Sequence, residues 1–436
     1  MDVFVFTAVF SALAFRANDP EVIMSTLSLS RDINILTKEK VQQKSQPINP
    51  LYNAWAEIDL GCIKHNVATI RRWIGGDVKL LAVIKADAYG HGINEISRTV
   101  LASGAEWLGV TSIAEALELR KLHPSARILI LSAGMYDHSK LIVKHNLTPI
   151  VSSRQMAALL NEAGEYYGKV VKVHLKIDTG MGRLGIWHEH AIDFIKYSAG
   201  LPFIQVEGIC SHFSSVSSSA LDMEFTREQL GNFENVVESA ARLGIYIPIR
   251  HIGNSGAVML MREAHLDLVR AGISVYGLVP SSEFKTLLPL KPALSLKSRV
   301  AYLKDVFPGR AISYGRTFKI QEKTRIATIP IGYSNGYARS LSNKGQVLVR
   351  GQRASVVGIV TMDQIMVDVG KIPNVNVGDE VVLIGEQGND RITATEVAKW
   401  AGTISYEILC KLNVPRVYFP TEESAEKEEK WLNAMP

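Results

Sequence analysis

Between Leu80 and about Tyr276, short runs of β-branched and other apolar residues alternate with longer segments whose apolar residues recur at helical spacing. The expected helical segments include Ile113–Leu122, Gln155–Tyr167 and Arg227–Leu243. The expected strands are Leu80–Lys85, Trp107–Thr111, Arg127–Leu131, Thr148–Val151, Val171–Ile177, Ile204–Cys210, Tyr246–His251 and Leu266–Ile273. About eight alternations of strand and helix predict a parallel sheet closed into a (β/α)8 TIM barrel. The competing architecture, a doubly wound open sheet, would need a glycine-rich dinucleotide turn after its first strand, and the sequence has none there.

Beyond Pro280 the pattern changes to runs of Val, Ile and Thr separated by glycine turns. The expected strands are Thr324–Ile331, Gly345–Val349, Ala354–Val360, Ile365–Val369 and Glu380–Ile384, followed by a short helix around Ala394–Trp400. This pattern predicts a mainly antiparallel β domain. We therefore divide the chain into an extension (1–50), a barrel (51–280), a β-rich C-terminal domain (281–420) and a charged tail (421–436).

The N-terminal extension contains an apolar run, Val3–Phe15, that is too short to span a bilayer. It resembles the core of a signal peptide, but the segment before it carries Asp2 and no Lys or Arg. The alternative is an extended or mis-started N-terminus, because Met24 opens a polar stretch. Residues 16–50 have no sustained apolar periodicity, which is typical of a linker or a disordered lead-in. We expect a cytoplasmic protein and leave export open.

Composition excludes several classes of protein. Of 436 residues, 47% are hydrophobic and 21% are charged, as in ordinary globular proteins, so disorder and fibrous structure are excluded. The net charge of +5 is small for this length, and the sequence has no arginine-rich block or basic helix that could follow a phosphate backbone. Both observations argue against a nucleic-acid partner. The 3 cysteines are widely spaced, so we expect neither a disulfide framework nor a metal site, and a reducing compartment fits best.

A lysine at the end of the first expected barrel strand is the strongest chemical signal. Lys85 follows the run Leu81-Ala82-Val83-Ile84, at the strand end where barrel enzymes keep their chemistry. Partial desolvation there lowers a lysine's pKa and frees its amine to form a Schiff base. Tyr89 follows within a tight glycine turn and adds a hydroxyl near the same barrel mouth. The alternative is a lysine whose stem packs at a strand end while its ammonium reaches solvent.

The octapeptide Lys85-Ala86-Asp87-Ala88-Tyr89-Gly90-His91-Gly92 resembles the cofactor-lysine motif of the alanine racemases, which are barrel enzymes dependent on pyridoxal phosphate. The resemblance runs in order from Ala54–Leu60 to Val414–Tyr418 and leaves out only the first fifty residues and the tail. It implies that pyridoxal 5′-phosphate is held as a Schiff base on Lys85.

A second motif runs from His174 to Gly185, and reads as a strand followed by a glycine-rich loop that holds Arg183. The planar guanidinium suits a substrate carboxylate, and the alternative is a surface arginine paired with Asp178. The family resemblance implies that Arg183 binds the substrate carboxylate. It also implies that Lys176, which is carbamylated in many members, orients Arg183.

Three more strand ends supply expected cofactor contacts. His212 ends one strand, and a lone histidine there is more often structural than catalytic. His251 ends the next, before Asn254 and Ser255, whose hydroxyl and neighbouring N–H groups suit a phosphate. By resemblance, His212 lies beside the cofactor and Ser255 binds its phosphate, with Asn254 adjacent and His251 as a supporting residue.

Arg270 ends the eighth expected strand and is followed by Gly272 and Ile273. By resemblance, Arg270 faces the pyridine nitrogen of the cofactor, and an arginine keeps that nitrogen unprotonated because it does not give up its own proton. The ring is then a weaker electron sink, which limits side reactions such as transamination. Gly272 and Ile273 would offer backbone N–H groups to the phosphate, where barrels commonly bind one.

The β-rich domain carries a second set of motifs. Tyr314, in Ala311-Ile312-Ser313-Tyr314-Gly315, matches the family's second base, which the partner subunit of a homodimer supplies. Its ordinary pKa of about 10 would have to be lowered by cations such as Arg270 and His251. By resemblance, the Met362 backbone contacts the substrate carboxylate, Asp363 supports it and Tyr333 lines the entrance. On their own, these segments would be ordinary strands and turns.

One segment departs from the family pattern. After Cys410 the family usually has a Ser or Thr and a tyrosine before Val-Pro-Arg, but here only Lys411-Leu412-Asn413 intervenes before Val414. The tyrosine that helps to hold the phosphate and narrows the entrance therefore has no evident match. We expect weaker cofactor retention or a wider entrance, which restoring a tyrosine near Asn413 would reverse.

The resemblance implies a racemase that interconverts L- and D-alanine by a two-base mechanism and supplies D-alanine for peptidoglycan. Lys85 would act on the D side and Tyr314 on the L side. A broad-specificity or serine racemase on the same scaffold is the alternative. A decarboxylase of basic amino acids is disfavoured, because that class typically places an acidic residue where this chain has Arg270. A non-enzymatic cofactor-binding barrel would end before the β-rich domain.

Overall fold

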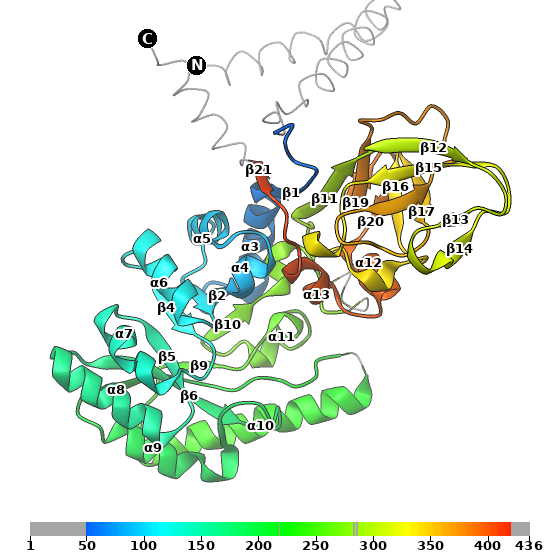
Figure 1. Ribbon diagram of the computed structural model, residues 1–436. Coiled ribbons are helices and arrows are strands. Elements are labelled where there is room, and N and C mark those ends of the chain that lie inside the picture. Colours follow the sequence, from blue (N-terminus) through cyan, green and yellow to red (C-terminus); the bar gives the residue numbers. More distant parts are fainter. Residues whose placement is uncertain (1–48, 218, 282–283, 285–286, 420–436) are drawn as a thin grey trace, which may run out of the picture. The chain divides into compact units, whose positions relative to one another are not determined.

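The computed structural model describes residues 49–217, 219–281, 284 and 287–419, so the predictions for the N-terminal extension before Asn49 and for the tail from residue 420 lie outside the described residues. Eight parallel strands form a barrel in the order β10-β2-β3-β4-β5-β6-β8-β9 (Figure 1). Their bounds are β2 (Lys79–Val83), β3 (Trp107–Val110), β4 (Arg127–Ile130), β5 (Thr148–Val151), β6 (Val171–Asp178), β8 (Ile204–Cys210), β9 (Ile249–His251) and β10 (Leu268–Ala271). Two backbone hydrogen bonds, Asp267 N to Arg250 O and Arg270 N to Gly253 O, bring β10 back against β9. The predicted barrel is confirmed.

Helices lie between successive barrel strands and cover the outer face (Figure 1). They are α3 (Leu60–Ile74), α4 (Lys85–Tyr89), α5 (Ile93–Ala102), α6 (Ile113–Leu122), α7 (Ser139–Lys144), α8 (Arg154–Tyr167), α9 (Ala191–Ala199), α10 (Ala220–Arg242) and α11 (Ser255–Leu260), with short 3-10 turns η1 (Tyr136–His138), η2 (His188–His190), η3 (Arg262–Ala264) and η4 (Ile273–Tyr276). The helix α6 begins where Ser112 and Glu115 cap each other's backbone N–H groups. The helix α3 precedes the barrel in sequence and packs against α5 and η4.

A second sheet of mainly antiparallel strands has the order β12-β15-β18-β17-β16-β19-β11-β1-β21. Its strands are β1 (Ala54–Asp59), β11 (Leu294–Arg299), β12 (Tyr302–Val306), β15 (Thr324–Ile329), β16 (Gln346–Val349), β17 (Gln352–Val356), β18 (Ile365–Asp368), β19 (Glu380–Gln387) and β21 (Arg416–Phe419). Smaller elements are β7 (Ile186–Trp187), which pairs with β6, β20 (Asp390–Ile392), the ribbon of β13 (Ala311–Ile312) and β14 (Phe318–Lys319), the turns η6 (Tyr314–Arg316), η7 (Tyr333–Asn335) and η8 (Arg339–Leu341), and the helices α12 (Ala394–Ala401) and α13 (Ser405–Cys410).

The second sheet takes strands from both ends of the described chain. Ala56 of β1 lies opposite Leu296 of β11 in antiparallel register and opposite Arg416 of β21 in parallel register. The chain therefore starts in this sheet, passes through the whole barrel, and returns to the same sheet. The sequence patterns did not indicate this arrangement, because the pairing joins residues that are more than two hundred positions apart.

The barrel strands follow the expected ranges closely, with two clear shortenings. The strand expected at Leu266–Ile273 is limited to Leu268–Ala271. The strand expected from Tyr246 begins only at Ile249, directly after Pro248, which has no N–H to donate to a neighbouring strand. Among the helices of the described residues, none is both long and apolar enough to cross a membrane. The described part of the chain also contains no cluster of three or more His, Cys, Asp or Glu side chains that could hold a metal ion.

Candidate active site

A cavity of about 830 Å³ opens at the C-terminal ends of the barrel strands. Ten of the residues that the sequence analysis singled out line it: Lys85, Tyr89, Lys176, Arg183, His212, Asn254, Ser255, Arg270, Gly272 and Ile273. They converge because the carboxyl ends of all eight parallel strands meet at one face of a barrel. The cavity brings together two amines, two guanidinium groups and several hydroxyl groups.

Lys85 stands at the start of a turn with an unusual backbone. The next four residues, Ala86 to Tyr89, have φ angles of 54°, 52°, 54° and 53°, in the left-handed helical region. This conformation costs about 1–2 kcal/mol for each residue other than glycine, so the surrounding contacts must hold it in place. The turn places Lys85 at one end of α4 and the buried Tyr89 at the other. Burial, and secondarily the Arg183 cation, lower the pKa of the Lys85 amine.

Hydroxyl and backbone N–H groups form a small polar cradle opposite Lys85. The backbone N–H of Gly272 donates to the Ser255 hydroxyl at 2.9 Å, and Ser274 donates to the same oxygen at 3.1 Å. A Cβ atom added to Gly272 would lie 2.7 Å from the Tyr89 hydroxyl, so glycine is needed for the close approach of Tyr89 to this backbone. As the first residue of η4, Ile273 has no intrahelical acceptor for its N–H. These groups suit an anion with several oxygen atoms.

Asn254 has a different part in this geometry from the one expected. Its side-chain oxygen accepts hydrogen bonds from Gly256 N at 3.0 Å and Ala257 N at 3.1 Å, which caps the start of α11. The cap fixes the position of Ser255, the first residue of that helix. Asn254 lines the cavity, but its oxygen is already committed to the helix.

Two of the three guanidinium nitrogen atoms of Arg270, Nη1 and Nη2, are bonded to hydrogen-bond acceptors. Nη1 lies 2.8 Å from His251 Nδ1, and Nη2 donates to Ser211 O at 2.9 Å, to Ile252 O at 2.9 Å and lies 3.0 Å from His212 Nδ1. Because a guanidinium only donates, both histidines must accept through Nδ1 and carry their proton on Nε2. The Nε–H of Arg270 has no hydrogen-bond acceptor among the described residues, so it is available to a ligand.

The histidines around Arg270 are uncharged. Burial and then the Arg270 cation lower the pKa of both His212 and His251 well below the usual range. His251 Nε2 in turn lies 2.7 Å from His174 Nδ1, and His174 Nε2 faces Glu207 at 3.8 Å. We expected a charged His251 to help to lower the pKa of Tyr314. This expectation is wrong, because His251 is neutral and its Nδ1 accepts from Arg270 instead.

Lys176 and Arg183 also line the cavity. Burial lowers the pKa of the Lys176 amine to about 8, so a substantial fraction is neutral near physiological pH. Asp178 accepts hydrogen bonds from the backbone N–H groups of residues 180–182 at 2.9–3.1 Å, which shapes the loop that carries Arg183. Within the described residues Arg183 forms no ion pair with Asp178, and its exposed guanidinium lines the cavity, where it is available to a ligand.

The expected residues of the β-rich domain do not reach this cavity within one chain. Tyr314 is 73% exposed, Met362 59% and Tyr333 44%, and Asp363 is also exposed. Backbone contacts hold their loops together: Tyr333 N donates to Thr361 O at 3.0 Å, and the Ser313 hydroxyl donates to Ile359 O at 2.6 Å. These four side chains therefore form an exposed group, which we call the Tyr314 surface.

The cavity also contains residues that the sequence motifs did not indicate, among them a tyrosine and a cysteine. Tyr406 and Cys410, both on α13, line the same cavity, and the Tyr406 ring lies 6.0 Å from the Tyr89 ring. Burial raises the pKa of Tyr406 to about 12. Tyr406 therefore supplies a tyrosine ring beside Tyr89 inside the cavity. The weaker cofactor retention or wider entrance expected from the short segment after Cys410 stays a prediction. Asn413 lies beyond α13, where its backbone N–H donates to Asn335 O at 3.0 Å.

Comparisons with known proteins agree with this geometry. Residues 58–280 match the model of the alanine racemase N-terminal domain, and residues 293–418 match that of the C-terminal domain. The alanine racemase of Halothermothrix orenii is 45% identical over 366 residues, which cover 84% of this chain and 96% of that protein. Two solved alanine racemases have the same fold. The structure from Clostridium difficile gives a TM-score of 0.80 at 37% identity and covers 85% of this chain and 97% of the other. That from Streptomyces lavendulae gives 0.82 at 33%, with 86% and 99% covered.

Proposed function

Because the chain belongs to the alanine racemase family, we propose that it interconverts L- and D-alanine with pyridoxal 5′-phosphate held by the Lys85 amine. The observation that carries this proposal is the content of one cavity. A half-buried lysine with a lowered pKa shares the cavity with a hydroxyl and N–H cradle and with an arginine whose two Nη atoms are bonded to neutral histidines and backbone oxygens. When bound, the cofactor supplies an electron sink that acidifies the Cα–H bond of the amino acid.

The cavity residues fit this cofactor. Gly272 lets the Tyr89 hydroxyl approach the backbone of residue 272 closely, so that the Tyr89 and Ser255 hydroxyls and the Ile273 N–H can be offered together to a phosphate. The free Nε–H of Arg270 can donate to the pyridine nitrogen. Because both its Nη atoms already donate to fixed acceptors, Arg270 keeps its own proton and its orientation. An aspartate or glutamate, which a decarboxylase would need there, is replaced by this arginine.

The remaining cavity residues would bind and orient the amino acid. Arg183 offers its guanidinium to the substrate carboxylate, and the Lys85 amine takes or returns the Cα proton on one face of the carbon. Lys176, as a buried amine with a pKa of about 8, is suited to carbamylation, because carbon dioxide reacts with the neutral form. The resulting negative charge would orient Arg183.

The proton on the opposite face requires a second group, which we assign to Tyr314 of a second copy. The Tyr314 surface is exposed in one chain, and its residues match the segments that the family supplies across a dimer interface. A homodimer with shared active sites would place Tyr314 opposite Lys85 and Met362 near the substrate carboxylate. The free thiols of all three cysteines fit a reducing compartment, so we place the enzyme in the cytoplasm, supplying D-alanine for peptidoglycan.

Removal of the Lys85 amine tests the proposal directly. Lys85→Ala should abolish both the visible absorbance of the cofactor-bound protein and the racemisation of L-alanine, followed as loss of circular dichroism. A panel of single L-amino acids with the unchanged enzyme should show alanine as the preferred substrate. Turnover retained by Lys85→Ala, or a preference for serine over alanine, would contradict the corresponding part of the proposal.

A further inference from the structure

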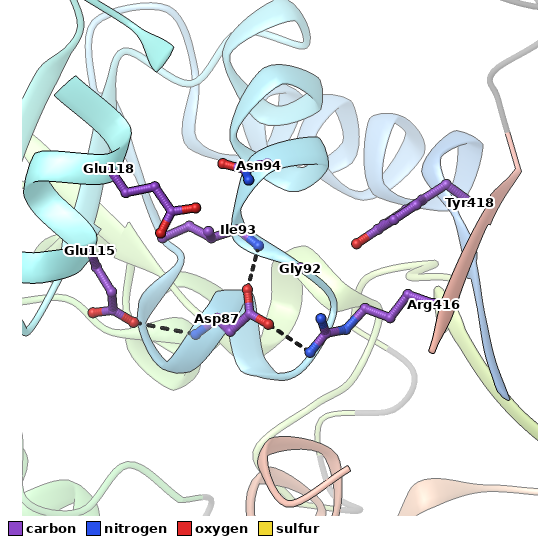
Figure 2. A pocket seen from close by; sticks show the side chains of 8 residues that line it. All are labelled: Asp87, Gly92, Ile93, Asn94, Glu115, Glu118, Arg416 and Tyr418. Carbon is purple, nitrogen blue, oxygen red and sulfur yellow. Dashed lines mark hydrogen bonds and ion pairs between the residues drawn. The ribbon is translucent and has the colours of Figure 1, made fainter. Parts of the chain in front are cut away.

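The C-terminal strand β21 contacts the left-handed turn that follows Lys85 through an ion pair and a hydrogen bond. Figure 2 shows Arg416 reaching from β21 to Asp87 in the middle of this turn, with its Nη2 2.6 Å from Asp87 Oδ2. Arg416 Nε also donates to the backbone oxygen of Gly90 at 2.7 Å. One side chain therefore holds the turn at two points, although it lies more than three hundred residues away along the chain.

Asp87 is also tied to the two helices that follow. Its Oδ1 accepts from the backbone N–H of Ile93 at 2.7 Å, at the start of α5, and its own N–H donates to Glu115 at 3.3 Å (Figure 2). Glu115 is the residue that caps α6 together with Ser112. The centre of the turn is thus connected to β21, α5 and α6, while its two ends are left to face the cavity.

Two C-terminal elements, α13 and β21, approach the turn so closely that glycines are required at two positions. A Cβ atom on Gly90 would lie 2.2 Å from Leu409 O, and one on Gly92 would lie 1.9 Å from the Tyr418 hydroxyl. Both glycines also have positive φ angles, of 81° and 94°. The close approach and the ion pair act on the same few residues.

We propose that Asp87 and Arg416 are positioning residues, which hold the left-handed turn so that the Lys85 amine and the Tyr89 hydroxyl both face the cavity. Without these contacts the disfavoured backbone relaxes toward ordinary φ angles, because Ala86, Ala88 and Tyr89 are not residue types that favour the left-handed region. Lys85 and Tyr89 each lie two residues from Asp87, so the amine and the hydroxyl would then no longer both point into the cavity. This inference rests on the proposed role of Lys85 as the cofactor lysine.

The effect is geometric, because the groups that lower the Lys85 pKa do not include Asp87 or Arg416. The ion pair is also partly exposed, with 26% of the Arg416 and 46% of the Asp87 side chain accessible, so its removal should leave the fold intact. A change in the rate at which Lys85 captures the cofactor, without a matching change in stability, separates positioning from simple support.

The test uses Asp87→Asn and Arg416→Lys in the full chain. Asparagine keeps an oxygen for the Ile93 N–H but removes the charge, and lysine keeps a cation but removes the Nε donor to Gly90. The matched control is Asp390→Asn, which breaks the exposed ion pair between Arg353 and Asp390 in the β-rich domain. The rate of Schiff-base formation would be measured by adding pyridoxal phosphate to each protein after its cofactor has been removed. The unfolding midpoint, and kcat and KM for alanine, would be measured on each protein with the cofactor bound.

We expect Asp87→Asn and Arg416→Lys to slow Schiff-base formation and to lower kcat by about tenfold or more, since a displacement of about 1 Å can cost that much. The KM for alanine should change by less than about twofold, because Arg183 lies on a different loop. Rates equal to those of Asp390→Asn would overturn the inference while leaving the function standing. Should Asp87→Asn fail to fold, Arg416→Lys decides alone. A wild-type protein that forms no Schiff base would overturn the proposed function itself, and this inference with it.

Discussion

His91 should make the protein sensitive to acid in a way that one substitution can isolate. Its ring is fully buried behind the left-handed turn, where Nδ1 lies 3.0 Å from Tyr89 O and Nε2 has no partner within the described residues. Burial lowers the pKa of His91 from 6.5 to about 4. Between these two pH values His91 is protonated in the unfolded chain but not in the folded protein. The free energy of unfolding must therefore fall as the pH falls through this window.

The size of the effect follows from the two pKa values. At pH 5 the unfolded histidine is almost fully protonated and the folded one is about a tenth protonated, so the folded state loses about 2 kcal/mol relative to pH 7. His91→Gln removes the titrating group but leaves an amide that can donate to Tyr89 O.

The assay is urea unfolding of the cofactor-free protein between pH 7 and pH 5, followed by far-ultraviolet circular dichroism. The other buried histidines titrate in both proteins, so they cancel when the two unfolding free energies are subtracted. His91→Gln should be less stable than the wild type at pH 7, and this deficit should shrink by about 2 kcal/mol at pH 5. A deficit that stays constant to within about 0.5 kcal/mol would show that His91 is protonated in the folded state, and the reasoning would be refuted.

Two further predictions concern the cofactor and the second base. Gly272→Ala should weaken cofactor affinity by about tenfold or more, measured by equilibrium dialysis, because the new Cβ lies 2.7 Å from the Tyr89 hydroxyl. Tyr89→Phe added to it should restore part of the space, and no recovery would argue against the clash. Tyr314→Phe should cripple proton abstraction from L-alanine while exchange of the Cα proton of D-alanine with solvent remains measurable. Equal loss of exchange for both enantiomers would contradict two separate bases.

The barrel could be predicted from sequence because its strands are local features. Segments such as Ile204–Cys210 and Thr148–Val151 appear with the expected bounds, since a run of β-branched residues between turns is readable within a few positions. The strand β12 was missed, because most of its residues are exposed and its apolar pattern is weak. The strands β1 and β21 were missed for a different reason, since each is defined by its partner rather than by its own composition.

The composition of the candidate site was also readable, because a parallel barrel gathers the ends of its strands at one face. A polar or charged residue at or near the C-terminal end of a strand, such as Lys85 or Arg270, is thereby placed at the cavity from its position in the sequence alone. Tyr406 was overlooked because it belongs to a short helix after the β-rich domain, and only packing brings that helix against Tyr89.

Sequence by itself therefore determined the barrel, the family and the identity of the groups at the barrel mouth. These depend on short-range patterns and on motifs with fixed spacing. Tertiary structure alone decided the left-handed turn after Lys85, the grip of Arg416 on Asp87, the neutral state of His251 and the exposure of Tyr314. The physical reason is common to all four. Backbone strain, burial and charge at a residue are set by contacts with segments far away in the chain, and no local pattern encodes those contacts.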